Sequence, residues 1–139
     1  MSVEHREIGK SIKRLEGRNK LTGGSIYVDD FSLDGMIHGC TIRSPKARGK
    51  IKKINFVEGV NWDEFTIVRA EDIPGDKIIH LIVNDQPWLA EDRVNHPEEP
   101  ILLIAHPDKN TLIKGRSLIT IDIEVEDSIH SIEDSLNKK

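Results

Sequence analysis

Residues 101–126 read ILLIAHPDKNTLIKGRSLITIDIEVE, and this stretch decides the fold class. Its first five residues form a continuous apolar run of strand length, which is typical of a strand buried on both faces. Residues 118–126 alternate between apolar and polar side chains, which is typical of a strand with one solvated face. The inward positions would be Ile119, Ile121, Ile123 and Val125, and the outward ones Thr120, Asp122, Glu124 and Glu126.

A short helix is expected between these two strands. Pro107 and Asp108 suit its first turn, since proline lacks an N–H that would go unpaired there and aspartate complements the positive helix end. Leu112 and Ile113 would form its buried side, and Gly115 suits its end. Strand, short helix and strand thus follow one another, and a right-handed parallel crossover is their simplest geometry.

Further elements are expected on either side of this unit. Turn-forming residues bound four strand candidates, at residues 25–28, 36–43, 51–57 and 65–68. In the second of these, Met36, His38, Cys40 and Ile42 would share one face. Residues 71–99 are expected to be mostly loop, and residues 131–136 to form one more helical turn. The sequence therefore predicts an α+β fold with a mixed sheet and one or two short helices.

Length, charge and cysteine count limit the kind of protein that this chain can be. Its 139 residues suit one domain, and a net charge of −4 disfavours general nucleic-acid binding. It has no apolar run long enough to span a membrane, and its first residues lack the apolar stretch of a signal peptide. The single cysteine, Cys40, cannot form an internal disulfide. We therefore expect a cytoplasmic protein without nucleic-acid or membrane partners.

Charge is distributed unevenly along the chain. Basic side chains gather in residues 43–53, and acidic ones follow Leu118. The basic residues are Arg43, Lys46, Arg48, Lys50, Lys52 and Lys53, and the acidic ones are Asp122, Glu124, Glu126, Asp127, Glu133 and Asp134. Such a basic run is usually a solvated loop and strand edge. The alternatives are a surface for an acidic partner or for a phosphate-bearing ligand.

Three motifs resemble parts of catalytic or phosphate-binding sites, but each lacks residues or geometry that such a site needs. Gly9-Lys10-Ser11 resembles the end of a phosphate-binding loop but lacks the earlier glycine and the preceding strand. Asp29 and Asp30 would point to opposite faces of an extended segment, so a turn-capping or strand-ending role is expected instead. The pair His38 and Cys40 has no third group to orient it, and a cysteine in an apolar strand is usually a core residue.

The remaining residues of interest are the histidines and Trp88. The six histidines are scattered without metal-ligand spacing. Trp88 is interpreted as core or interface packing. The residues alone therefore predict no catalytic, cofactor-binding or metal-binding residues in this chain.

An ordered series of short motifs carries a resemblance to a known family. The series is Gly9-x4-Arg14-x-Glu16-Gly17-x2-Lys20-Leu21-Thr22-Gly23-x3-Tyr27-x-Asp29-Asp30, Gly35-Met36-x-His38, Ile42-Arg43-Ser44-Pro45-x-Ala47-x2-Lys50-Ile51, Gly59-Val60, Thr66, Asp72-Ile73-Pro74-Gly75, Leu89-Ala90-x2-Arg93-Val94 and Glu99-Pro100. It resembles the opening of the molybdenum-binding large subunit of xanthine dehydrogenases and aldehyde oxidases, over roughly residues 8 to 136. Glu98 stands where the family usually has glycine, and residues 110–115 are poorer in helix formers than the family's alanine-rich helix.

The resemblance implies an α/β-hammerhead domain at residues 9–136, with tails at residues 1–8 and 137–139. In the family this domain precedes the larger domains that hold molybdopterin and the catalytic glutamate, so no catalytic residue carries over. The chain would be a non-catalytic structural domain or small subunit of a xanthine dehydrogenase-like oxidoreductase. Its partner would be the molybdopterin-binding subunit, in a complex that also holds iron–sulfur clusters and, in many cases, FAD.

The expected contact with that subunit is the turn Arg43-Ser44-Pro45 and the basic strand after it. The alternative function is a free-standing binding or adaptor module that keeps the fold without the enzyme. In that case the basic run would serve an acidic protein or a small anion. A subunit should expose a contiguous apolar patch, whereas a free monomer should not.

Overall fold

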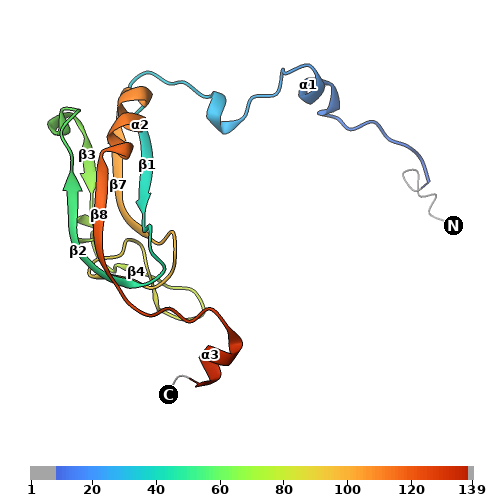
Figure 1. Ribbon diagram of the computed structural model, residues 1–139. Helices are drawn as coiled ribbons and strands as arrows, with labels where there is room; N and C mark the ends of the chain where they lie inside the picture. The colour runs from blue at the N-terminus through green and yellow to red at the C-terminus, as the bar shows by residue number, and fades with distance from the viewer. Residues whose placement is uncertain (1–8, 138–139) are drawn as a thin grey trace. The chain divides into compact units, whose positions relative to one another are not determined.

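The structure, a computed structural model, describes residues 9–137, so the expected tail at residues 1–8 lies outside the described residues. Its internal contacts divide the chain between Asp34 and Gly35 into two compact units, which are described one by one. Figure 1 shows the elements in chain order.

The first unit contains the helix α1 (Gly17–Leu21) and the 3₁₀ turn η1 (Val28–Asp30). The strand expected at residues 25–28 is therefore wrong. Asp30 supplies the physical reason, because its carboxylate accepts a hydrogen bond at 2.9 Å from the Tyr27 N–H, which a strand would offer to a neighbouring strand. This contact confirms the turn-capping role for Asp30, whereas no strand ends at this pair.

In the second unit, sheet A contains β1 (His38–Arg43), β7 (Pro100–His106) and β3 (Thr66–Val68) in the order β1-β7-β3. The predicted strands at residues 36–43, 65–68 and 101–105 correspond to these three. Both pairings are antiparallel, with Cys40 opposite Ile104 and Ile67 opposite the same residue. Every second residue of each strand thus faces one side of this sheet.

Sheet B contains β6 (Arg93–Val94), β2 (Gly49–Phe56) and β8 (Ile119–Val125) in the order β6-β2-β8. The pairing of β2 with β8 shifts between Ile51 and Lys53, which inserts one extra residue as in a β-bulge. Ile119, Ile121 and Ile123 are partly buried, as the alternation predicts, whereas Val125 at the strand end is exposed.

The parallel crossover expected from residues 101–126 is wrong, because β7 and β8 lie in different sheets. The helix α2 (Lys109–Ser117) connects them at one end of the unit (Figure 1). This connection is short for a parallel return, and the charged outer face of β8 suits a solvated antiparallel edge. All strand pairs in residues 9–137 are antiparallel, so the α+β class is confirmed and the expected mixture of strand directions is not found there.

The core lies between sheets A and B. Its main cluster joins Leu102 and Ile104 of β7 to Ile42 of β1, Phe65 and Leu112 of α2. A second cluster around Val94 and Ile101 closes the other end, against partly buried isoleucines of sheet B. The two sheets therefore share one apolar interior, and each has an outer face that does not contribute to it.

Gly115 lies within α2 rather than ending it, since the helix continues to Ser117. Leu112 is buried as expected, but Ile113 is 58% exposed and points away from the core. A β-carbon on Gly115 would lie 2.6 Å from Cζ of Phe65, closer than atoms can pack. The glycine is needed here for close packing of the helix on an aromatic ring rather than for a turn.

Replacing Gly115 with alanine should destabilise the protein although alanine is the better helix former. Alanine gains about 1 kcal/mol of helix propensity, but overpacking costs roughly 1–3 kcal/mol. Phe65 cannot swing aside freely, because its ring is packed 5.0 Å from Trp62 and 4.8 Å from His106 between centroids. Urea unfolding should show the loss, and Gly115→Ala with Phe65→Leu should recover part of it. A stabilised Gly115→Ala protein would contradict this packing.

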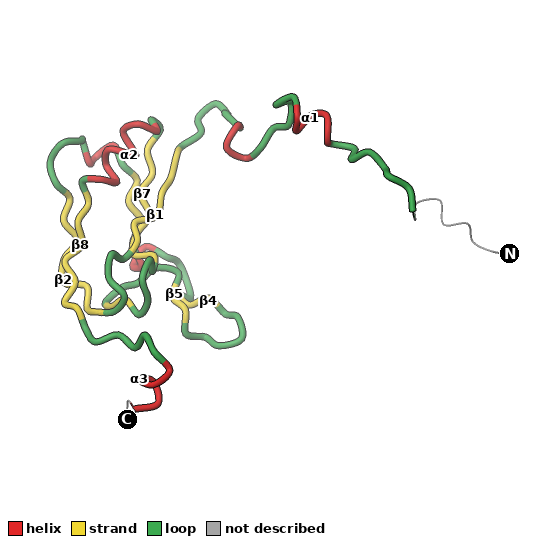
Figure 2. The backbone as a smooth tube through the Cα atoms, turned by 45° about the vertical axis from the view of Figure 1, so that its right-hand side comes forward, coloured by secondary structure: helices red, strands yellow, loops and turns green. Residues whose placement is uncertain are grey.

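The part of the chain between β3 and β7 is mostly loop, as expected. It contains the 3₁₀ turn η3 (Ala70–Asp72) and the two-residue strands β4 (Ile78–Ile79) and β5 (Gln86–Pro87). Figure 2 shows β4 and β5 as a hairpin beside the main sheets.

Two further elements complete the described chain. The 3₁₀ turn η2 (Trp62–Glu64) precedes β3, and the helix α3 (Ile132–Asn137) corresponds to the helical turn predicted at residues 131–136. Among residues 9–137, no helix has the length and apolar character to cross a membrane.

Candidate docking surface

The basic and the acidic segments of the sequence lie side by side on the outer face of sheet B. Basic β2 lies beside acidic β8, with Lys50 opposite Glu124 and Lys53 opposite Asp122. Lys52 Nζ contacts Glu124 Oε2 at 2.6 Å, and this hydrogen bond lowers the pKa of the Glu124 carboxyl. These pairs are exposed, so each contributes little to stability, but together they balance the charge of this face.

The same pairing continues at the end of the sheet. Arg48 Nε lies 3.5 Å from Glu126 Oε2, and Arg93 also pairs with that carboxylate. Two residues of the basic run, Arg48 and Lys52, are thus in ion pairs with acidic groups of the same chain.

The turn Arg43-Ser44-Pro45 is braced from inside the protein. Ser44 is only 1% exposed, its Oγ donates to the Lys46 carbonyl at 2.6 Å, and its N–H donates to the Glu99 carbonyl at 2.9 Å. Arg43 donates from Nη1 to the carbonyl of Glu98, which holds a left-handed backbone at φ 62°. Glycine at position 98 would adopt that conformation without strain. Arg43 and Pro45 remain exposed, so these two could contact a partner, while Ser44 holds the turn together.

The outer face of sheet A is apolar and open. Thr41, Leu103 and Val68 lie in one row across its three strands, since Leu103 pairs with Thr41 on one side and Val68 on the other. This row forms the floor of a hollow of about 580 Å³, which we call the sheet A hollow. The other residues that line it are Ile73, Pro74, Asp76, Trp88, Leu89 and Pro100. Leu103 at its centre is 40% exposed, although it belongs to the most apolar strand of the chain.

The wall of the hollow comes from the loops between β3 and β7, to which the sequence patterns assign no element. The side chain of Trp88 is exposed, with 53% of the residue accessible. Its backbone N–H donates to the Lys77 carbonyl at 2.9 Å, which fixes the backbone of this wall. Asp76 is the one ionisable residue of the lining, and its carboxylate contacts His80 Nε2 at 2.6 Å. This hydrogen bond lowers the pKa of Asp76 and raises the pKa of His80. The hollow is therefore an apolar surface whose single carboxylate already has a partner.

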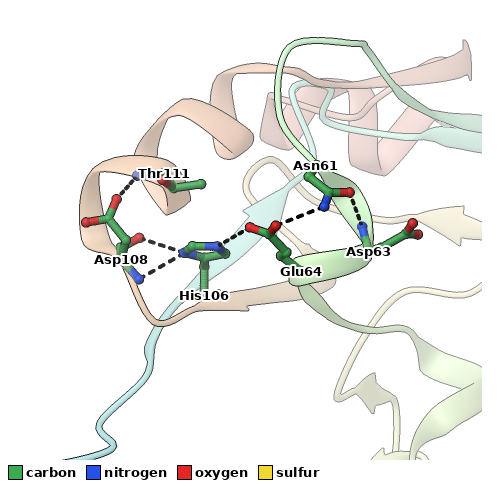
Figure 3. A network of polar contacts seen from close by, with 6 residues as sticks. All are labelled: Asn61, Asp63, Glu64, His106, Asp108 and Thr111. Atoms are coloured by element: carbon green, nitrogen blue, oxygen red, sulfur yellow. Dashed lines mark hydrogen bonds and ion pairs between the residues drawn. The ribbon is translucent and has the colours of Figure 1, made fainter.

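A separate polar network fixes the end of sheet A where α2 begins (Figure 3). His106 is 8% exposed, and its Nδ1 accepts a hydrogen bond from the Asp108 N–H at 2.9 Å. Its Nε2 lies 3.7 Å from Glu64 Oε2, and Asn61 Nδ2 donates to the same carboxylate at 2.9 Å. The Asp108 carboxylate accepts from the Thr111 N–H at 2.6 Å, which caps α2 and lowers the pKa of Asp108. The network ties η2 to the start of α2.

Cys40 packs against the main core cluster, and burial raises the pKa of its thiol. The expected packing of Cys40 as a small residue against the core is found in the structure. Iron–sulfur clusters need several cysteine thiolates, and this chain has one cysteine. Among residues 9–137, no three histidine, cysteine or acidic side chains gather as metal ligands. The described residues thus do not fit a metal or cluster site.

The sheet A hollow is the feature that sequence reasoning missed as a site. Its signal was present in the run at residues 101–105, which predicts burial on both faces, whereas residues 35–137 cover one face and leave Leu103 40% exposed on the other. Ile73, Pro74 and Trp88 gave no pattern of their own, because they lie on loops whose course the sequence does not reveal.

Comparison with known proteins assigns the fold to a family. Residues 22–127 match the family described as aldehyde oxidase and xanthine dehydrogenase, a/b hammerhead domain. A relative from Bacillus subtilis (strain 168), named as one subunit of a probable xanthine dehydrogenase, is 32% identical over 119 residues, which cover 83% of this chain and 16% of the relative. The nicotinate dehydrogenase large molybdopterin subunit of Eubacterium barkeri is 22% identical, over 99% of this chain and 33% of its own length.

Solved structures agree with this assignment. Quinoline 2-oxidoreductase from Pseudomonas putida 86 superposes with a TM-score of 0.74 at 25% identity, over 93% of this chain and 18% of that one. The chain therefore spans a third or less of each of these three proteins. On the family match and the shared fold, this chain belongs to the a/b hammerhead domain family of aldehyde oxidases and xanthine dehydrogenases.

Proposed function

We propose that this chain is a non-catalytic structural domain or small subunit of a molybdenum hydroxylase, which packs against the molybdopterin-binding part of that enzyme. The observation that carries the proposal is the match of residues 22–127 to the hammerhead domain family. The chain spans a third or less of the length of the two relatives named above, so the rest of each relative lies outside the matched region. The relatives are oxidoreductases by name, and one is named as a molybdopterin subunit.

The proposal includes the composition of the complex and the bounds of the domain. Molybdopterin, iron–sulfur clusters and FAD would be held by other parts of the enzyme, in the cytoplasm. The hammerhead domain would extend over residues 9–136. The exposed Arg43 and Pro45 of the turn at residues 43–45 would make one of the contacts. What the residues of this chain do is structural, since they shape and cover one side of the cofactor-bearing part.

The alternative, a free-standing module that binds an acidic protein or an anion, depended on the basic run. Across sheet B that run faces the acidic side chains of β8, and Arg48 and Lys52 already have carboxylate partners. An anion would have to compete with these internal carboxylates. We therefore propose no second function.

Affinity purification of the full chain from its source cell tests the proposal. A tagged chain should be recovered with a molybdopterin-binding polypeptide, and metal analysis of the complex should detect molybdenum and iron. An unrelated tagged protein from the same cells controls for carry-over of metal. Recovery of the chain alone, free of both metals, would refute the proposed function.

A further inference from the structure

We infer that the sheet A hollow is the surface by which this chain docks on the molybdopterin-binding polypeptide, and that it takes up an apolar ridge of that polypeptide. This inference rests on the proposed function and adds to it the location and the chemistry of the contact. The ridge is a helix or strand edge that presents aliphatic or aromatic side chains and no unpaired carboxylate.

The first argument is the contrast between the outer face of sheet A and the outer face of sheet B. The outer face of sheet B carries matched charges and is suited to water, with Lys50 opposite Glu124 and Lys53 opposite Asp122. The outer face of sheet A has Leu103 and Val68 at its centre, with Trp88 and Pro74 beside them. Antiparallel sheets commonly have one solvated and one covered face, yet here each sheet already covers the other on its inner side. The apolar outer face of sheet A is therefore a second face suited to burial, and within the second unit none of residues 35–137 covers it.

The second argument is the shape of this surface. A hollow of about 580 Å³ accommodates several side chains, and its floor is a rigid three-stranded sheet. Trp88 stands at its wall with 53% of its surface exposed. Half-exposed tryptophan beside a preformed apolar hollow is typical of the residues that dominate binding energy at protein interfaces. The surface is thus preorganised to accept a protruding apolar group.

The third argument identifies the occupant. In the Bacillus subtilis relative and in quinoline 2-oxidoreductase, the matching region is 16% and 18% of one long polypeptide, so most of the chain lies beyond it. That remaining polypeptide is physically attached to the hammerhead domain and has the length to provide a cover. Charge narrows its chemistry, because Asp76 of the lining is paired with His80, and neighbouring Lys77 is paired with Glu91 at 2.9 Å. The one carboxylate of the lining and the lysine beside it thus already have partners of opposite charge, and an apolar ridge fits the rest of the lining.

Site-specific photo-crosslinking in the source cell tests the location. The full tagged chain would carry p-benzoylphenylalanine at Trp88, or, as a matched control, at Ile113, which is 58% exposed on α2 outside the hollow. A third position, Pro45, probes the turn at residues 43–45. Mass spectrometry should identify crosslinks from position 88 to the molybdopterin-binding polypeptide, at least about tenfold more abundant than those from position 113, because contact at a hot spot is local.

The outcomes separate this inference from the proposed function. If the wild-type chain brings down molybdenum but crosslinks arise only from position 45 or 113, the hollow is not the docking surface and the proposed function stands. Crosslinks from position 88 to a second copy of this chain would also overturn the inference. If the wild-type chain brings down no molybdenum enzyme, the proposed function itself fails.

A substitution gives an independent readout. Trp88→Ala should lower the molybdenum recovered with the chain at least about tenfold, as expected for an interface anchor, while Ile113→Ala should leave it unchanged. Thermal unfolding of each isolated full chain should remain near that of the wild type, since both side chains are more than half exposed. Unchanged recovery with Trp88→Ala would overturn the inference.

Discussion

Gly49→Ala should destabilise the protein by about 3 kcal/mol or more, at the upper end of overpacking effects. Gly49 is the first residue of β2, the central strand of sheet B, and it pairs with Val94 of β6 and Val125 of β8. A β-carbon there would lie 2.3 Å from the backbone oxygen of Glu124 and 2.6 Å from a methyl carbon of Ile123. Backbone in a paired strand cannot rotate away as the end of a side chain can. The methyl group would therefore separate β2 from β8.

Denaturant unfolding of the full chain measures this effect, and Gly39→Ala is the matched control. Gly39 is also a strand glycine, in β1, but the nearest atom to an added β-carbon is the Ile104 carbonyl oxygen at 3.8 Å, an ordinary contact. Gly39→Ala should change the free energy of unfolding by less than about 1 kcal/mol. Equal effects at the two glycines would show that the approach of β2 to β8 is not as close as described.

Leu102→Ala should cost about 3 kcal/mol of stability, within the range of roughly 2–5 kcal/mol for removing a fully buried leucine side chain. Leu102 is 0% exposed and lies in the main core cluster between the sheets. Its neighbours come from both sheets and from α2, so they cannot all move in to fill the space. A cavity should remain where the side chain was.

Thermal unfolding provides the measurement, and the adjacent residue provides the control. For a unit of this size, a loss of about 3 kcal/mol lowers the Tm by more than about 10 °C. Leu103→Ala changes the same residue type one position further along β7, on the open face, where the side chain is 40% exposed. It should lower the Tm much less. If the two alanine variants unfold alike, the assignment of covered and open faces of sheet A is wrong.

Sequence patterns located most of the strands because these depend on local alternation. His38, Cys40 and Ile42 share a face as predicted, and the isoleucines of β8 do so up to Ile123. The helix expected after residue 105 is present, but Pro107 and Asp108 precede it rather than form its first turn, since α2 begins at Lys109 and Asp108 is its N-cap. These features are set by side chains a few residues apart, so the sequence displays them directly.

Pairing partners could not be predicted in the same way. β7 and β8 look like neighbours along the chain, but the structure places them in separate sheets, and no local pattern records that choice. Gly115 reads as a helix end because glycine is common there, while its actual role depends on the distant ring of Phe65. The sheet A hollow was missed for the same reason, since its wall and its floor come from distant segments.

The order in which the strands pair has a consequence for biosynthesis. His38 of β1 pairs with His106 of β7, and Gly49 of β2 pairs with Val125 of β8. The strands β1 and β2 therefore cannot form these pairings until β7 and β8 have been synthesised. Neither main sheet can close while the ribosome is still making the middle of the chain. Distant pairings of this kind make folding slow, and strands that wait with open edges can pair with other chains. A nascent chain that stops before β8 would leave the central strand of sheet B without its long partner, and chaperones would have to protect it until synthesis passes Val125.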